Sequence, residues 1–246
     1  MPENDKQPGL AEQALNKAAE MGLTSQLRDV EKMDVAIKTN PLKLIQGEVE
    51  AVSVEGEGLL MQKDLRVEKL EVQAGRISIN PLAAALGKIE LEQPTEATAR
   101  VLLTEADLNR SLNSEYIRGM LQNLQIEAEG RALSVDVQQV EAKLPGEERL
   151  WMRSRLSIHQ TGETQEVTFT ARLVRSGNRI ALEDIQYPEG GDLSPELTAG
   201  LQVKANELGN ISNFELDGMS LRLQTLEVRR GEIDLTVEIY AEQFPS

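Results

Sequence analysis

Two short stretches of the chain share one pattern of polar and apolar positions. NPLKLIQGEVE begins at Asn40 and NPLAAALGKIE begins at Asn80; each runs Asn-Pro-Leu, an apolar segment, Gly and then a strand-like segment. Asn is a common helix N-cap, Pro fits the first helical position, and Gly commonly follows a helix end. We therefore predict two short capped helices that redirect the chain into strands.

Helical spacing of apolar and small residues predicts longer helices elsewhere. One begins near Leu10 and is expected to stop at Gly22. Another follows Thr104, which with Asp107 approximates a capping box. Asn113-Ser114 is expected to cap a second helical segment after it. A last helix is predicted in SPELTAGLQVKANELGN, with Ser at the cap, Pro at the first position and Gly after its end.

Residues 125–187 alternate apolar and polar positions with period two, which is typical of strands. QTGET and RSGNR separate these runs and have the composition of hairpin connections. The pattern predicts an antiparallel meander with one apolar face. Helices combined with antiparallel strands give an α+β fold class.

A longer repeat links LRVEKLEVQAGRISI (65–79) with LRLQTLEVRRGEIDL (221–235). In both copies the apolar positions change parity between the second and third apolar residues, which indicates either a β-bulge or a strand that is apolar on both faces. Gly75 and Gly231 fall where a hairpin would reverse. We interpret the two copies as an internal structural repeat of a helix-plus-sheet unit.

Composition narrows the function classes for this chain of 246 residues. Its net charge of −15 and only seven aromatic residues (one Trp, three Tyr, three Phe) make nucleic acid an unfavourable partner. The chain has no Cys, which fits a reducing compartment. MPENDKQPGL has no apolar signal segment, and no apolar run is long enough to span a bilayer. We expect a cytoplasmic protein that contacts membranes peripherally.

No motif of a known catalytic type is found, so we expect no enzyme, no cofactor and no metal site. The single His, His159, is out of parity with the apolar strand positions and is expected to face solvent. Two groups of Arg lie on adjacent predicted strands, and either bind lipid head groups or form a solvated strand face. These are Arg149, Arg153 and Arg155, and Arg172, Arg175 and Arg179.

Leu and Ile residues of the predicted helices have two interpretations. They belong to a packed core, or they line an apolar cavity that holds lipid and its mouth at the membrane. The candidates for cavity or membrane contact are Leu42, Leu44, Ile45, Leu82, Leu86, Leu108, Leu112, Leu121, Leu197 and Leu201. Periodicity alone does not separate the two interpretations.

The chain resembles the LmeA-like family in QGEVEAVSVEGEG, in LTEADLNRSLNSE and in the order of the segments around them. The resemblance implies phospholipid binding and a long, strongly curved antiparallel sheet wrapped around long helices, as in tubular lipid-binding (TULIP-type) domains. It implies no catalytic residues.

We therefore expect residues 1–8 to be a flexible tail and residues 9–246 to form one domain of lipid-binding type. That domain would hold acyl chains in an apolar cavity without catalysing a reaction, and it would serve lipid transfer or membrane-lipid homeostasis. The alternative is a protein-interaction module with a packed core that docks on a membrane complex.

Overall fold

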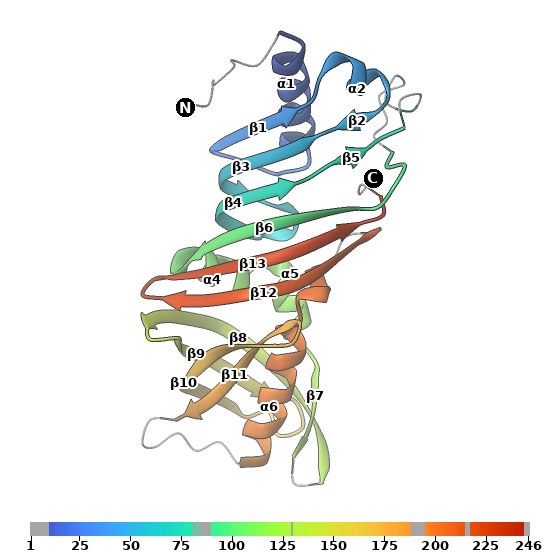
Figure 1. The fold of residues 1–246 in the computed structure, drawn as a ribbon. Coiled ribbons are helices and arrows are strands. Elements are labelled where there is room, and N and C mark those ends of the chain that lie inside the picture. Colours follow the sequence, from blue (N-terminus) through green and yellow to red (C-terminus); the bar gives the residue numbers. More distant parts are fainter. Residues whose placement is uncertain are drawn as a thin grey trace.

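The computed structural model describes residues 10–80, 83, 90–128, 130–187, 195–214 and 217–243. Two antiparallel sheets follow one another along the molecule, and we call them the large sheet and the small sheet (Figure 1). Helix α1 (Leu10–Ser25) lies at the end formed by the large sheet, and α6 (Pro195–Leu208) lies at the other end. The antiparallel α+β class expected from the sequence is confirmed.

The large sheet brings together strands from both ends of the chain. Its spatial order is β1 (Lys32–Lys38), β3 (Ala51–Leu60), β4 (Arg66–Ala74), β6 (Thr95–Thr104), β13 (Glu232–Ala241) and β12 (Met219–Arg229). The late strand β13 therefore lies between β6 and β12. A short ladder of β2 (Glu48–Val49) with β5 (Ile77–Ser78) continues the pairing of β3 with β4 toward the same end as α1.

The small sheet is the meander that the period-two pattern predicts. Its spatial order is β11 (Arg179–Gln186), β10 (Thr164–Ser176), β9 (Arg149–Ile158), β8 (Arg131–Gly146) and β7 (Leu124–Ala128). Pairing of β8 with β9 shifts register twice, and pairing of β10 with β11 shifts once. Such irregularities bend strands and increase their twist, which accounts for the curl of this sheet.

Helix α6 lies inside this curl and contacts both edge strands, β7 and β11. Asn206 of α6 accepts from the backbone N–H of Leu182, and Gln202 donates to the carbonyl of Leu182. Gly200 approaches β7 so closely that a Cβ there would lie 2.0 Å from Cγ2 of Ile126. The small sheet is therefore strongly curled around one helix, and the expected strong curvature is present in this sheet.

Asn side chains occupy both edges of the large sheet. Asn16 of α1 accepts from the backbone N–H of Ile37 on β1. Asn178, in the turn between β10 and β11, accepts from the N–H of Leu223 and donates to the carbonyl of Leu221 on β12. Each amide hydrogen-bonds to backbone groups of an edge strand that would otherwise be free to pair with another strand.

Two clusters of buried apolar side chains form the core. The first lies where the large sheet, the small sheet and α4 (Glu105–Leu112) meet, and it includes Leu144, Leu150 and Leu223. The second fills the space between the small sheet and α6, and it includes Leu156 and Leu197. The two sheets therefore join through packing as well as through the turn at Asn178.

Local helix signals are mostly confirmed. Asn40 caps α2 (Pro41–Ile45) by accepting from the N–H of Lys43, and Asn80 accepts in the same way from the N–H of Ala83. Thr104 and Asp107 form the predicted capping box of α4, and Ser114 caps α5 (Glu115–Met120). The stop at Gly22 is wrong, because α1 continues to Ser25. The cap at Ser194 lies outside the described residues.

Helix lengths differ from the long helices that the resemblance implies. In the described part of the chain the longest are α1, with 16 residues, and α6, with 14. These correspond to about 24 and 21 Å. Each helix covers part of one sheet, and neither runs along both.

The predicted internal repeat is not a structural repeat. Residues 221–235 form β12 and the start of β13, and the chain reverses at Gly231 as expected. Residues 66–78 form β4 and then β5, which pair with β3 and β2 respectively, so the chain does not reverse at Gly75. In β12 the parity change comes from a bulge between Leu223 and Thr225. In β4 there is no register shift, so the parity change there means that apolar residues lie on both faces of the strand. Similar strand sequences therefore serve different topologies.

Candidate lipid-binding surfaces

One face of the large sheet is apolar across its whole width, in three rows of directly paired residues. Row one is Met33, Gly56, Leu70, Val101, Leu235 and Leu226; row two is Val35, Val54, Val72, Ala99, Val237 and Leu223; row three is Ile37, Val52, Ala74, Ala97, Ile239 and Leu221. Every position in these three rows, which we call the apolar rows, is aliphatic, Met or Gly. The β12 bulge keeps Leu223 and Leu226 on this face although they are three residues apart.

Burial is uneven along the apolar rows. Leu223, Val237 and Leu235 are buried in the first core cluster. Toward β3 and β4, side chains such as Val54 and Val72 are only half-buried. All six residues of row three are half-buried. The core therefore covers this aliphatic surface at β12 and β13, while Val54 on β3 and Val72 on β4 stay half-buried.

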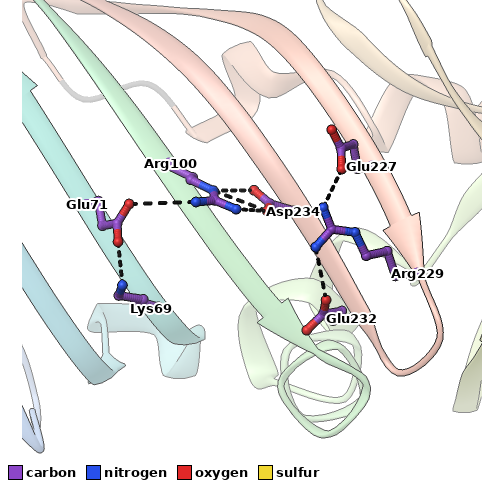
Figure 2. A network of polar contacts seen from close by, with 7 residues as sticks. All are labelled: Lys69, Glu71, Arg100, Glu227, Arg229, Glu232 and Asp234. Atoms are coloured by element: carbon purple, nitrogen blue, oxygen red, sulfur yellow. Dashed lines mark hydrogen bonds and ion pairs between the residues drawn. The ribbon is translucent and has the colours of Figure 1, made fainter.

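The opposite face of the large sheet is charged, as Figure 2 shows. Arg100 on β6 makes a bidentate pair with Asp234 on β13, with Nη2 to Oδ2 at 2.6 Å, and lies 4.0 Å from Glu71 on β4. Glu71 also accepts from Lys69, and this bond raises the pKa of Lys69. The sheet thus has one aliphatic and one ionic face, and an acyl chain would meet only the first favourably.

A cleft of about 920 Å³ lies where β4, β6, β13 and β12 meet the turn between β10 and β11. Row three reaches this cleft through Ala97, Ile239 and Leu221. Its lining is otherwise mainly polar and includes Glu96, Glu238 and Arg222. Arg175 at the end of β10 and Asn178 in the turn contribute from the small sheet. The cleft therefore combines part of an aliphatic row with groups that can hydrogen-bond.

The end of the molecule formed by α1 and α2 has exposed apolar side chains. Leu42 and Ile45 of α2 are each 75% exposed, and Leu44 is half-buried. Met21 and Leu23 of α1 are also exposed. The α2 corner and the corner that starts at Asn80 are adjacent, because Ile79 donates its N–H to the carbonyl of Gly47.

Charge on α2 is neutralised locally. Lys43 donates to Glu50, and this hydrogen bond, followed by the charge of Lys43, lowers the pKa of the Glu50 carboxyl. The ion pair leaves Leu42 and Ile45 as the exposed features of the helix. Exposed Leu and Ile separated by one turn are typical of peripheral membrane contacts.

Comparison with family models shows to which family the chain belongs. Residues 7–238 match the model described as LmeA-like phospholipid-binding. The chain belongs to this family. No curated protein and no solved structure matches it. The description of the family is one of phospholipid binding.

Two further properties of this LmeA-like chain concern membranes and metals. In the described part of the chain, no helix is long and apolar enough to cross a bilayer. Within those same residues, no group of three or more His, Asp or Glu side chains is placed to hold a metal ion.

The sequence-predicted candidates of the LmeA-like chain fall into separate groups. Leu108 and Leu112 are half-buried against the first core cluster. Leu197 is buried in the second cluster, Leu201 packs against it, and Leu121 is buried at the end of α5. Leu42 and Ile45 are exposed, so the packed-core interpretation does not hold for these two residues. Leu82 and Leu86 lie outside the described residues.

The predicted Arg groups are divided by the structure. Arg153 pairs with Glu141, and Arg172 pairs with Glu183, so these side chains form part of a solvated strand face. Arg175 instead lies in the cleft. His159 is exposed as predicted and lies 2.9 Å from Asp136.

Sequence reasoning missed the three apolar rows and the cleft. The signal for the rows was present, since β1, β3, β4, β6 and β13 each alternate apolar and polar residues. Alternation within one strand does not say which strands are neighbours, and the rows reach β12 only because β13 inserts between β6 and β12.

Proposed function

We propose that this protein binds phospholipid without catalysing a reaction, with acyl chains lying against the half-buried part of the apolar rows. The observation that carries this proposal is the pairing of eighteen apolar positions in three rows, of which row three is half-buried throughout. Each CH₂ group removed from water contributes about 0.8 kcal/mol, so a sixteen-carbon chain needs no polar contact to bind.

We further propose that α1 and α2 bring this surface to the membrane. Both helices lie at the same end of the molecule (Figure 1), and they carry the exposed side chains Met21, Leu23, Leu42 and Ile45. Insertion of these side chains would place the ends of β3 and β4 near the lipid from which a chain is taken. Residues 9–246 would then act as one unit that transfers lipid between membranes, in the manner of a TULIP-type domain.

The direct test is to purify the protein without detergent and to identify co-purified lipid by native mass spectrometry. Val54→Trp fills part of row two with an indole ring, while the matched Glu55→Trp places the same ring on the opposite face. We expect near-stoichiometric phospholipid on the wild type and on E55W, and a severalfold lower occupancy on V54W. Equal occupancy of both variants would contradict the proposed position of the acyl chains.

A second candidate function is a protein-interaction module with a packed core. It is favoured by the close contact of α6 with the small sheet, where Ile126, Leu156 and Val135 are almost wholly buried. A pyrene-labelled phospholipid separates the two candidates. Saturable one-to-one binding supports the lipid carrier, and absence of any binding to delipidated protein supports the interaction module.

A further inference from the structure

The cleft contains a cation that is not engaged by a carboxylate. Nη1 of Arg175 donates to the carbonyls of Gly177 and Leu223, each at a long 3.4 Å. Among the residues that the structure describes, no Asp or Glu oxygen lies within 4.0 Å of its guanidinium. By contrast, Arg172 of the same strand pairs with Glu183 and Asp184.

Other described Arg side chains, Arg179 among them, also have no carboxylate within 4.0 Å, and Arg175 differs from these in lining the cleft. A guanidinium has five N–H donors in a planar fork that matches the oxygens of a phosphate. The two long bonds to carbonyls hold Arg175 at the edge of β12 and leave most of its donors available for an anion.

Arg175 lies close to the aliphatic row that we propose for the acyl chain. Leu223, whose carbonyl it contacts, belongs to row two, and Leu221 and Ile239 of row three line the same cleft. Asn178, also in the lining, is fixed by two hydrogen bonds to β12 and holds the turn in place. A volume of about 920 Å³ is within the usual size range of a small-molecule site.

We propose that this cleft receives the phosphate-bearing head group of the bound phospholipid, with Arg175 as the contact to its phosphodiester. The inference rests on the proposed function and adds a site for the polar end of the ligand. A phospholipid would lie with its acyl chains along the apolar rows and its phosphate beside β12. A lipid with the same chains and no phosphate would lack this contact and would bind more weakly.

The test compares two pyrene-labelled lipids with identical acyl chains, a phosphatidylglycerol and a diacylglycerol, on the delipidated full chain. Arg175→Gln removes the cation, and Arg175→Lys keeps the charge without the fork. Arg179→Gln is the matched control, because it removes the same charge from the other side of the same turn and Arg179 is outside the cleft lining. Urea denaturation of each variant checks that the fold is retained.

We expect Arg175→Gln to weaken phosphatidylglycerol binding roughly ten- to a hundredfold, the usual effect of losing a charged hydrogen bond, and to leave diacylglycerol binding unchanged. Arg175→Lys should retain part of the preference, and Arg179→Gln should retain all of it. The inference is overturned if Arg175→Gln keeps the wild-type preference or weakens both lipids equally.

Two further outcomes separate this inference from the proposed function. If the wild type binds both lipids equally well, the head-group site is wrong while lipid binding stands. If it binds neither lipid, the proposed function itself fails. Glycerol 3-phosphate is the third ligand: displacement of phosphatidylglycerol by millimolar amounts would assign the cleft to soluble phosphate esters and overturn the head-group inference.

Discussion

Gly209, directly after α6, lies against β11 so closely that a Cβ would stand 2.1 Å from the carbonyl oxygen of Ile180. The carbonyl of Gly209 also accepts from the N–H of Ile180 at 2.9 Å. This backbone contact fixes the end of α6 to one edge of the small sheet, while Gly200 fixes its middle to the other edge. The close packing of the small sheet on α6 thus depends on two positions, Gly200 and Gly209, that have no Cβ atom.

Gly209→Ala should destabilise the protein by about 3 kcal/mol, since the clash is with backbone that cannot rotate away. Urea denaturation followed by circular dichroism measures this. Gly22→Ala in α1 is the control, because its Cβ would meet no atom within 4 Å and Ala favours helices; we expect up to about 1 kcal/mol of stabilisation. A loss at Gly209 no larger than the change at Gly22 would contradict the close contact.

Asp107 should be a main determinant of stability at the start of α4. Its carboxylate is 1% exposed and accepts from Arg66, from the Thr104 hydroxyl at 2.6 Å and from the Thr104 N–H at 2.9 Å. Asp107→Ala removes the capping box and leaves these donors without their acceptor, so we expect a loss of about 3 kcal/mol or more in the free energy of unfolding.

The matched control for Asp107 is Glu183→Ala. Glu183 also pairs with an Arg, at 3.1 Å, but both side chains are well exposed, and such pairs contribute less than about 1 kcal/mol. Similar losses in the two variants would show that burial does not set the value of the Asp107 contacts.

Stability should fall at acidic pH partly through Asp136. The backbone N–H of Asn123 and then His159 hydrogen-bond to its carboxylate and hold the pKa of Asp136 below the usual value. A lowered folded-state pKa stabilises the protein above about pH 4 and loses that contribution as pH falls through the folded-state value. Asp136→Asn should therefore destabilise at pH 7, and the difference from wild type should shrink below about pH 4.

Urea denaturation at both pH values measures the Asp136 effect. Asp34→Asn is the control because it removes an exposed carboxylate of β1, and it should change the free energy of unfolding by less than about 0.5 kcal/mol. A difference between wild type and Asp136→Asn that is the same at pH 7 and at acidic pH would rule out this linkage.

Membrane contact through α2 is tested with the double variant Leu42→Ser and Ile45→Ser. Vesicle co-sedimentation should fall about tenfold or more, because two exposed aliphatic side chains no longer enter the bilayer, while the unfolding midpoint stays unchanged. Val203→Ser, at an exposed position of α6 away from α2, should leave vesicle binding at the wild-type level. Equal loss in both variants would point to general surface hydrophobicity instead.

The sequence predicted features that depend on neighbouring residues. The caps at Asn40, Thr104 and Ser114 are formed within three residues of the cap, and they are present as expected. The meander of the small sheet also follows from hairpins between consecutive strands. In both cases the contacts that define the structure are close in sequence.

Features that depend on distant pairing were not predictable from the pattern. The chain continues at Gly75 but reverses at Gly231, although the flanking residues are alike, because β5 pairs with β2 rather than with β4. Arg175 was grouped with Arg172 and Arg179 by spacing, yet only the contact of its turn with β12 places it in the cleft. Contacts between residues far apart in sequence therefore determine both the path of the chain at Gly75 and the position of Arg175.

The position of β13 in the large sheet has a consequence for biosynthesis. Residues 124–208 contain the small sheet and α6, so that part can close soon after it leaves the ribosome. Thr104 on β6 pairs with Glu232 on β13, so the edge of β6 stays open until β13 has been synthesised. Late closure of non-local strand pairs is slow and exposes the chain to aggregation. Nascent protein should therefore expose the unpaired edge of β6 until β13 emerges, after the meander of residues 124–186 has become protease-resistant.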